Sequence, residues 1–234
     1  MTATIGVDLA QRRDHSAVVL VESYRPEPET PTDWPPVRHD VRWATKFPLG
    51  MGFTEQVAAI KTIAEACGPL GHTIMVVDST GLGAVVVEML RSITAVSMRT
   101  VVFTGGESAT KVSAFEHHVP KRDLLAAVGI VLEQERLGVP MSCPFRTDLL
   151  DEMLSIERSI SERGHDSYAA AGQGHDDLTM ALCLAVWWAD RPDQGAVWHQ
   201  AALLRAARSP AAQRAAEQAA RDRLADYQAR ARAR

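Results

Sequence analysis

The sequence is poor in the features that mark several large classes of protein. Its 234 residues include three cysteines, Cys67, Cys143 and Cys183, with no CxxC pair. Thiols so few and so far apart exclude a disulfide framework and a cysteine-based zinc site, so we expect buried free thiols in a reducing compartment. The chain has no run of about 18 apolar residues and no basic-then-apolar N-terminus, so we expect neither a membrane span nor a signal peptide.

The chain also lacks an overall positive charge. Its formal net charge is −4, but this value hides an asymmetry. From Ala196 onward there are eight arginines against three acidic residues, a net charge of +5, so the preceding part carries about −9. An acidic body with a basic tail is not typical of a protein that binds DNA by bulk charge alone. If the chain acts on nucleic acid, divalent cations must mediate at the site.

Hydrophobic periodicity predicts one α/β domain. Strands are expected at residues 4–8, 16–22, 37–47, 73–77 and 98–104. Helices are expected at residues 53–67, 84–92, 121–135, 147–156 and 178–188. A tight polar turn joins the first two strands, which predicts a hairpin, whereas the last two strands alternate with helices and are expected to be parallel. The fold class is therefore a mixed sheet, with strands 1–3 antiparallel and strands 4–5 parallel, flanked by helices.

The remaining segments are expected to be peripheral. Residues 26–36 contain five prolines and predict an exposed loop, and residues 157–171 predict a polar hairpin or ordered loop. Residues 195–234 contain fifteen alanines and little bulky apolar material. This composition favours a solvated or partner-seeking pair of helices, broken near Ser209-Pro210. We therefore place a domain at residues 1–192 and a basic helical tail at 193–234.

Acidic residues occupy corresponding positions in this plan. Asp8 closes the first strand, Asp78 closes the first buried parallel strand, and Asp176 and Asp177 open the apolar helix Leu178–Trp188. Ligands bind at the carboxyl ends of strands in open α/β sheets, so these carboxylates are expected to meet at one rim. Such a cluster suits Mg²⁺ or Mn²⁺, and two such ions can promote phosphodiester hydrolysis by water. Asp8, Asp78, Asp176 and Asp177 are therefore the candidate metal ligands and catalytic residues.

Each acidic residue also has a structural alternative. Asp8 can cap the turn that follows it, Asp78 can form an Asx-turn with the next residues, and an aspartate near a helix N-terminus accepts backbone hydrogen bonds. Adjacent like charges at Asp176 and Asp177 are harder to explain in this way, because they repel each other unless a cation binds both.

Other polar residues are weaker candidates. Lys121 is a possible contact for DNA phosphates or a support of the site, and His175 either orients an aspartate or the attacking water or is a plain loop residue. Arg12, Arg13 and Arg122 are further possible phosphate contacts. The remaining candidates favour structural roles: a turn former at Asp14, a turn at residues 79–83, surface histidines at 117–118 and core packing at Trp187-Trp188.

Three motifs together resemble the nuclease domain of tailed-phage terminase large subunits, an RNase H-like domain. They are Gly6-Val7-Asp8-Leu9-Ala10 with Asp14, Val77-Asp78-Ser79-Thr80-Gly81-Leu82-Gly83, and Gly174-His175-Asp176-Asp177-Leu178. The resemblance covers about residues 3–190, including residues 119–124. It implies that Asp8, Asp78 and Asp176 are metal ligands, with Asp177 adjacent, and that the family's DNA cleavage has little sequence preference.

The resemblance implies a metal-dependent endonuclease that uses two Mg²⁺ or Mn²⁺ ions to cut concatemeric double-stranded DNA during packaging. Terminases also carry an ATPase domain, but this chain has no GxxxxGK[ST] phosphate loop. We therefore expect a separate or missing ATPase domain, and a portal or small terminase subunit as partner, in the bacterial host cytoplasm. The alternatives are a Holliday-junction resolvase-like nuclease and a non-catalytic docking module of the packaging motor.

Overall fold

The computed structural model describes residues 2–10, 14–26, 35–70, 72–81, 83–93, 96–160, 166–170, 175–191 and 210–232. Arg12, Arg13, most of the proline-rich loop, Gly172–Gly174 and the first half of the tail lie outside the described residues. Among the described helices, none combines the length and the apolar character that a membrane span requires.

One mixed sheet of eight strands organises the described residues, in the order β6-β7-β5-β4-β1-β2-β3-β8. The strands are β1 (Thr2–Asp8), β2 (Ala17–Tyr24), β3 (Arg38–Lys46), β4 (His72–Asp78), β5 (Ser97–Thr104), β6 (Thr110–Lys111), β7 (Glu116–Pro120) and β8 (Leu137–Gly138). Strands β1, β2 and β3 pair antiparallel, whereas β4 pairs parallel with β1 and with β5. The mixed pairing of strands 1–5 that the sequence predicts is therefore confirmed.

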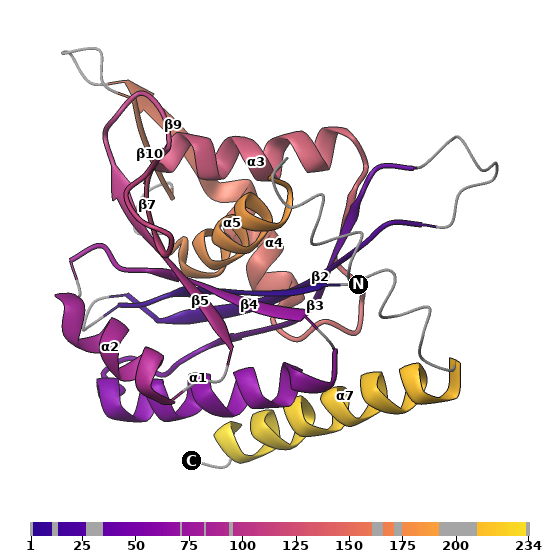
Figure 1. Cartoon of the computed structure of the whole chain (residues 1–234). Helices are drawn as coiled ribbons and strands as arrows, with labels where there is room; N and C mark the ends of the chain where they lie inside the picture. The colour runs from indigo at the N-terminus through magenta and orange to yellow at the C-terminus, as the bar shows by residue number, and fades with distance from the viewer. Residues whose placement is uncertain are drawn as a thin grey trace.

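Helices cover both faces of this sheet (Figure 1). The helices are α1 (Phe53–Cys67), α2 (Gly83–Ile93), α3 (Lys121–Glu133), α4 (Arg146–Ser155), α5 (Asp177–Ala189) and α7 (Pro210–Arg232), with a short 3-10 turn, η1 (Gly68–Leu70). Helices α3, α4 and α5 lie on one face, and α1, α2 and α7 lie on the other. The hairpin expected after α4 is present as β9 (Ile156–Ile160) and β10 (Asp166–Ala170).

Side-chain alternation along the strands divides the core into two clusters. In β1, Ile5 and Val7 face the cluster that contains α1 residues, and in β4, Val76 belongs to the cluster that contains α5. All three residues are fully buried. Alternation then puts Gly6 and Asp8 on the α5 side of β1, and Asp78 on the α5 side of β4. The face on which each acidic residue lies follows from this period of two.

The backbone of helix α5 packs directly against the backbone of β1, because β1 contains Gly6 at the point of contact. A Cβ atom on residue 6 would lie 1.8 Å from the carbonyl oxygen of Ala181 and 3.1 Å from the amide nitrogen of Ala185. No larger residue fits without moving the helix. Every residue of α5 is buried, as its continuously apolar sequence requires. The helix that begins with Asp177 is thus fixed against the strand that ends with Asp8.

One prediction about the periphery is wrong. The pair His117-His118 was expected at the surface, but His117 lies in β7, is 3% exposed, and contacts the rings of Trp187 and Trp188 edge-on at 5.7 and 5.5 Å. The polar pair His117-His118 gave no sign of a strand, although His117 and Val119 of β7 are buried. Both tryptophans pack in the core, as predicted, and the three cysteines are buried and free.

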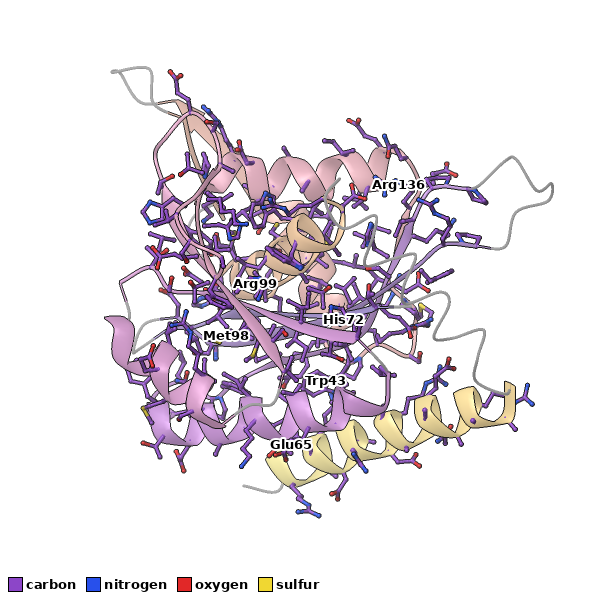
Figure 2. The ribbon with its side chains drawn as sticks, in the orientation of Figure 1. Trp43, Glu65, His72, Met98, Arg99 and Arg136 are labelled. Atoms are coloured by element: carbon purple, nitrogen blue, oxygen red, sulfur yellow. The ribbon has the colours of Figure 1, made fainter. Side chains whose placement is uncertain are left out.

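The tail was expected to be solvated or to seek a partner, but α7 packs along α1 of the same chain (Figure 1). Ala220 and Leu224 are 2% and 4% exposed, and Tyr227 meets Trp43 edge-on at 6.0 Å. Trp43 lies between the sheet and these helices (Figure 2). Small alanines let the two helices approach, so a few apolar side chains suffice for docking. The boundary at residues 192–193 stays a prediction.

Candidate metal centre

Two of the predicted acidic residues end neighbouring parallel strands. Val7 pairs with Val77 in the β1–β4 ladder, so the next residues, Asp8 and Asp78, leave the sheet side by side. Both project toward α5, because they share the parity of the α5-facing residues. Asp78 is 6% exposed, and a hydrogen bond joins its carboxylate to the Asp8 carboxyl. The convergence expected of these two strands is therefore present.

The other two acidic residues arrive from the start of α5. Asp176 occupies the N-cap position, and Asp177, which is 4% exposed, is the first helical residue. Lys121, the first residue of α3, places its Nζ 2.6 Å from Asp176 Oδ2. The charges of Asp78, Asp177, Asp176 and Lys121 all act on the Asp8 carboxyl, so the acidic residues of β1, β4 and α5 lie near one another, with Lys121 among them.

Burial raises the pKa values of Asp8, Asp78 and Asp177. Burial raises the pKa of Asp8 well above its usual value, and the charges of Asp78, Asp177 and Asp176 raise it further, while Lys121 lowers it. Burial raises the pKa of Asp78 to about 6, although Thr80 and Asp8 donate hydrogen bonds to it. Holding these carboxyl groups in the charged form therefore costs free energy.

The pKa of Asp177 is also raised to about 6, by burial first and then by the charge of Glu152. Its Oδ2 atom is buried and accepts no hydrogen bond from the described residues. A buried carboxylate oxygen without a donor is costly, and a bound cation would supply the missing partner. Hard carboxylate oxygens are the ligands that Mg²⁺ and Mn²⁺ prefer. The residues present therefore fit a divalent metal ion.

His175 lies between two of these carboxylates. Its Nδ1 atom is 3.7 Å from Asp14 Oδ1 and 3.9 Å from Asp177 Oδ2, and its ring contacts His15 edge-on. Asp14, His175 and Asp177 each offer one potential metal-ligand atom, and these three atoms lie within 4.8 Å of one another. Asp14 was expected only to form a turn, but its carboxylate also reaches the rim. The geometry supports the interpretation that His175 orients an aspartate.

The structural alternative holds for Asp78 but not for Asp176. Asp78 Oδ1 accepts a 2.7 Å hydrogen bond from the Thr80 amide, which is the Asx-turn expected there. Asp176, by contrast, makes no side-chain cap hydrogen bond to α5. Arg122 does not point at the carboxylates: its guanidinium bonds the carbonyl oxygen of Glu107 and lies 3.5 Å from Asp123.

Sequence reasoning missed Lys46 and Glu152. Lys46 is the last residue of β3, and its Nζ forms an ion pair with Glu152 of α4. Glu152 Oε2 in turn accepts a 3.0 Å hydrogen bond from the backbone amide of Thr179, in the first turn of α5. The ending of β3 in a lysine was the available signal for Lys46. For Glu152 there was none, because it is one of several acidic residues in α4.

Comparison with known proteins supports the resemblance seen in the motifs. The terminase large subunit of Thermus phage G20c is 26% identical over 136 residues, and that of Thermus virus P23-45 gives the same figures. The matched residues are 58% of this chain but 24% of each relative, so the chain spans about a quarter of their length. No family model matches the chain.

Solved structures show the same fold. The large terminase nuclease of phage G20c with bound magnesium superposes with a TM-score of 0.55 at 22% identity, covering 79% of this chain and 80% of that one. The human cytomegalovirus terminase nuclease domain, soaked with Mn, gives 0.50 at 13% identity, covering 80% and 83%. The RNase H-like fold and the resemblance to terminase nuclease domains are thus confirmed.

Proposed function

We propose that this chain is a metal-dependent endonuclease and acts as the nuclease part of a viral DNA-packaging terminase large subunit. The observation that carries the proposal is the convergence of Asp8, Asp78 and Asp176 at one rim of an RNase H-like sheet, beside Asp177. The raised pKa values of Asp8, Asp78 and Asp177 support a cation in the same place, as does the buried Asp177 Oδ2 atom, which accepts no hydrogen bond from the described residues. The similarity to phage terminases supports DNA as the substrate.

In the proposed site, Asp8, Asp78 and Asp176 are the metal ligands, with Asp177 supporting one ion. Two Mg²⁺ or Mn²⁺ ions, when bound, activate a water and stabilise the leaving oxygen of the phosphodiester. The protein contributes rigid placement: Asp8 and Asp78 are fixed by paired strands, and Asp177 by a buried helix. No serine or cysteine nucleophile is required.

Two further residues assist in this proposal. Lys121, which pairs with Asp176, neutralises part of the acidic cluster and presents an ammonium to the DNA phosphate. His175 holds the orientation of Asp177 from the loop side. The larger assembly also belongs to the proposal: an ATPase domain, a portal or a small terminase subunit, in the cytoplasm of a bacterial host.

The test is a plasmid-cleavage assay with the full chain. We expect the wild-type chain to nick and linearise supercoiled DNA with Mn²⁺ and to stop when EDTA is added. Because loss of a ligand's outer partner alone typically costs 10- to 100-fold, Asp78→Asn should reduce the rate by roughly 100-fold or more. Asp148→Asn, an exposed carboxylate in the first turn of α4, is the matched control and should cleave like the wild type.

Three results would contradict the proposal. Undiminished cleavage by both Asp78→Asn and Asp176→Asn would exclude the site, and a strong preference for four-way junctions over linear duplex would favour a resolvase. A chain that never cleaves, but whose function is lost when residues 196–234 are deleted, would instead be a docking module.

A further inference from the structure

The first turn of α5 is capped by another helix. The first backbone N–H groups of a helix have no partner within it, and the N-cap residue usually supplies one. Asp176 is the N-cap of α5 but makes no such bond. Glu152 Oε2 fills this role from α4, accepting a 3.0 Å hydrogen bond from the Thr179 amide. Glu152 is 7% exposed, so this bond is shielded from water.

Glu152 is itself tied to the sheet. Its other carboxylate oxygen forms an ion pair with Lys46 Nζ, and both side chains are largely buried. Lys46 pairs with Ala17 across β2–β3, and Ala17 pairs with Asp8 across β1–β2. Lys46 and Asp8 therefore stand on one line across the sheet, two strands apart. A continuous path of contacts runs from this rim through Lys46 and Glu152 to the helix turn that carries Asp177.

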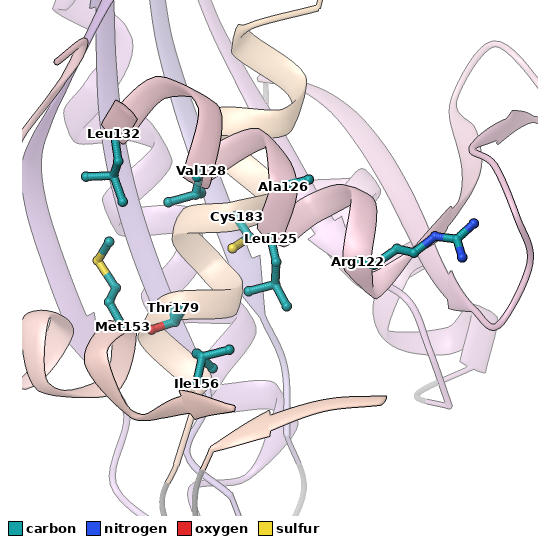
Figure 3. A pocket seen from close by; sticks show the side chains of 10 residues that line it. Arg122, Leu125, Ala126, Val128, Leu132, Met153, Ile156, Thr179 and Cys183 are labelled. Carbon is teal, nitrogen blue, oxygen red and sulfur yellow. The ribbon is translucent and has the colours of Figure 1, made fainter. Parts of the chain in front are cut away.

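This turn also borders a hollow. A hollow of about 400 Å³ lies beside Thr179, between α3, α4 and α5 (Figure 3). Its walls include Leu125, Met153 and Cys183. The Thr179 hydroxyl is buried, yet it has no hydrogen-bond partner among the described residues. Thr179 is thus held by the hydrogen bond from its backbone amide to Glu152.

We propose that Glu152, held by Lys46, is a positioning residue for the metal centre: it fixes the first turn of α5 and thereby the carboxylates of Asp176 and Asp177. The inference rests on the proposed nuclease function. In this role Glu152 does not contact DNA. It acts through its hydrogen bond to the Thr179 amide, two residues after Asp177 in α5. Outer partners of metal ligands typically contribute 10- to 100-fold to metal affinity or activity.

The experiment compares Glu152→Ala with a matched control in the full chain. Glu22→Gln is the control, because Glu22 is 4% exposed and also forms an ion pair, with Arg42 Nε at 2.6 Å, on a strand of the same sheet. Calorimetry measures Mn²⁺ affinity, plasmid nicking gives kcat and KM, and thermal unfolding gives stability. We expect Glu152→Ala to lose roughly 10- to 100-fold in Mn²⁺ affinity and in kcat, with KM for DNA little changed.

Glu22→Gln should lose thermal stability but keep its Mn²⁺ affinity within about two-fold, because Glu22 pairs with Ala3 near the start of β1, whereas the acidic rim lies at Asp8, where β1 ends. Lys46→Met should reproduce part of the Glu152→Ala effect, and Lys46→Arg should restore it. Glu152→Ala with wild-type Mn²⁺ affinity and only a lower unfolding temperature would overturn the proposal, since Glu152 would then be a structural anchor alone.

A metal-free measurement separates this inference from the nuclease proposal. Amide hydrogen exchange at residues 177–180 reports the first turn of α5 without any metal or DNA. We expect Glu152→Ala to accelerate exchange there while Glu22→Gln does not. Unchanged exchange would refute the positioning role even if the wild-type chain binds Mn²⁺. Accelerated exchange in a chain that binds no Mn²⁺ would instead refute the nuclease proposal.

Discussion

Helix α5 has carboxylates at both ends, and the two ends treat them in opposite ways. At the N-terminal end, Asp177 and Asp78 are buried, and burial raises the pKa of each to about 6. At the C-terminal end, burial acts to raise the pKa of Asp190, but hydrogen bonds from Arg136 and His39 more than offset it, so the pKa is lowered. One helix thus joins a crowded acidic site to a neutralised one.

The C-terminal end is a completed network. Arg136 donates two hydrogen bonds to Asp190, at 2.7 and 2.9 Å, and its position near the end of α3 is labelled in Figure 2. His39 bonds Asp190 through Nε2 and Ser23 through Nδ1. This order of serine, histidine and aspartate resembles a hydrolase triad, but Ser23 and His39 are both 0% exposed, so no substrate reaches them. The network therefore serves stability.

The two ends of α5 therefore differ in their effect on the stability of the metal-free protein. Paired, fully bonded charges hold the helix in place, whereas the crowded carboxylates lower the stability of the metal-free protein and are the ones suited to bind a cation. Changes at one end should therefore affect stability alone, and changes at the other should affect metal binding.

The largest effect on stability should come from the C-terminal end. Arg136→Met removes the two hydrogen bonds that Arg136 donates to Asp190, whose side chain is 26% exposed. This change should lower the free energy of unfolding by about 2–4 kcal/mol. Urea unfolding measures this change. Mn²⁺ affinity, measured by calorimetry, should stay within about two-fold of wild type. A large loss of Mn²⁺ affinity in Arg136→Met would show that the two ends are coupled.

The next effect is a pH dependence of opposite sign at the two ends. The raised pKa values of Asp78 and Asp177 favour the folded state while these groups are protonated, so this stability is fully present below about pH 4 and is lost as pH rises through about 6. For Asp190 the lowered pKa gives stability that is present above about pH 4 and lost below it. The metal-free protein should therefore unfold at its highest temperature between about pH 4 and 5.

A bound metal ion should offset the loss of stability at neutral pH. Protons and divalent ions compete for the same carboxylates, so Mn²⁺ should raise the unfolding temperature more at about pH 7.5 than at about pH 5. Thermal unfolding with Mn²⁺ and with EDTA, at both pH values, measures the difference. An equal shift at both pH values would contradict the assignment of Asp78 and Asp177 to the metal centre.

The smallest effect should come from a glycine in α3, away from both ends of α5. Gly129 lies in the middle of α3, and a Cβ atom there would meet nothing within 4 Å. Gly129→Ala should raise the free energy of unfolding by about 0.5–1 kcal/mol, because alanine loses less conformational entropy on folding. Mn²⁺ affinity should not change. A shift in that affinity would mean that the rigidity of α3, which begins with Lys121, controls the rim.

Much of the candidate site was predictable because its signals are local. A buried strand that ends in an acid predicts where Asp8 and Asp78 emerge, and two adjacent aspartates before an apolar segment predict the start of α5. The strand at residues 116–120 was missed because His117-His118 is polar, and its burial depends on the two tryptophans of α5. The docking of α7 was missed because alanine-rich surfaces give a weak packing signal.

By itself, the sequence determined the alternation that puts Asp8 and Asp78 on one face and the helix that follows Asp176, since each depends on residues close together in the chain. Only the tertiary structure decided that Lys121 would pair with Asp176, that Lys46 and Glu152 would brace the same turn, and that Arg136 would neutralise Asp190. These contacts join residues far apart in sequence. Their energies depend on burial and on distances of a few ångströms, which no local pattern encodes.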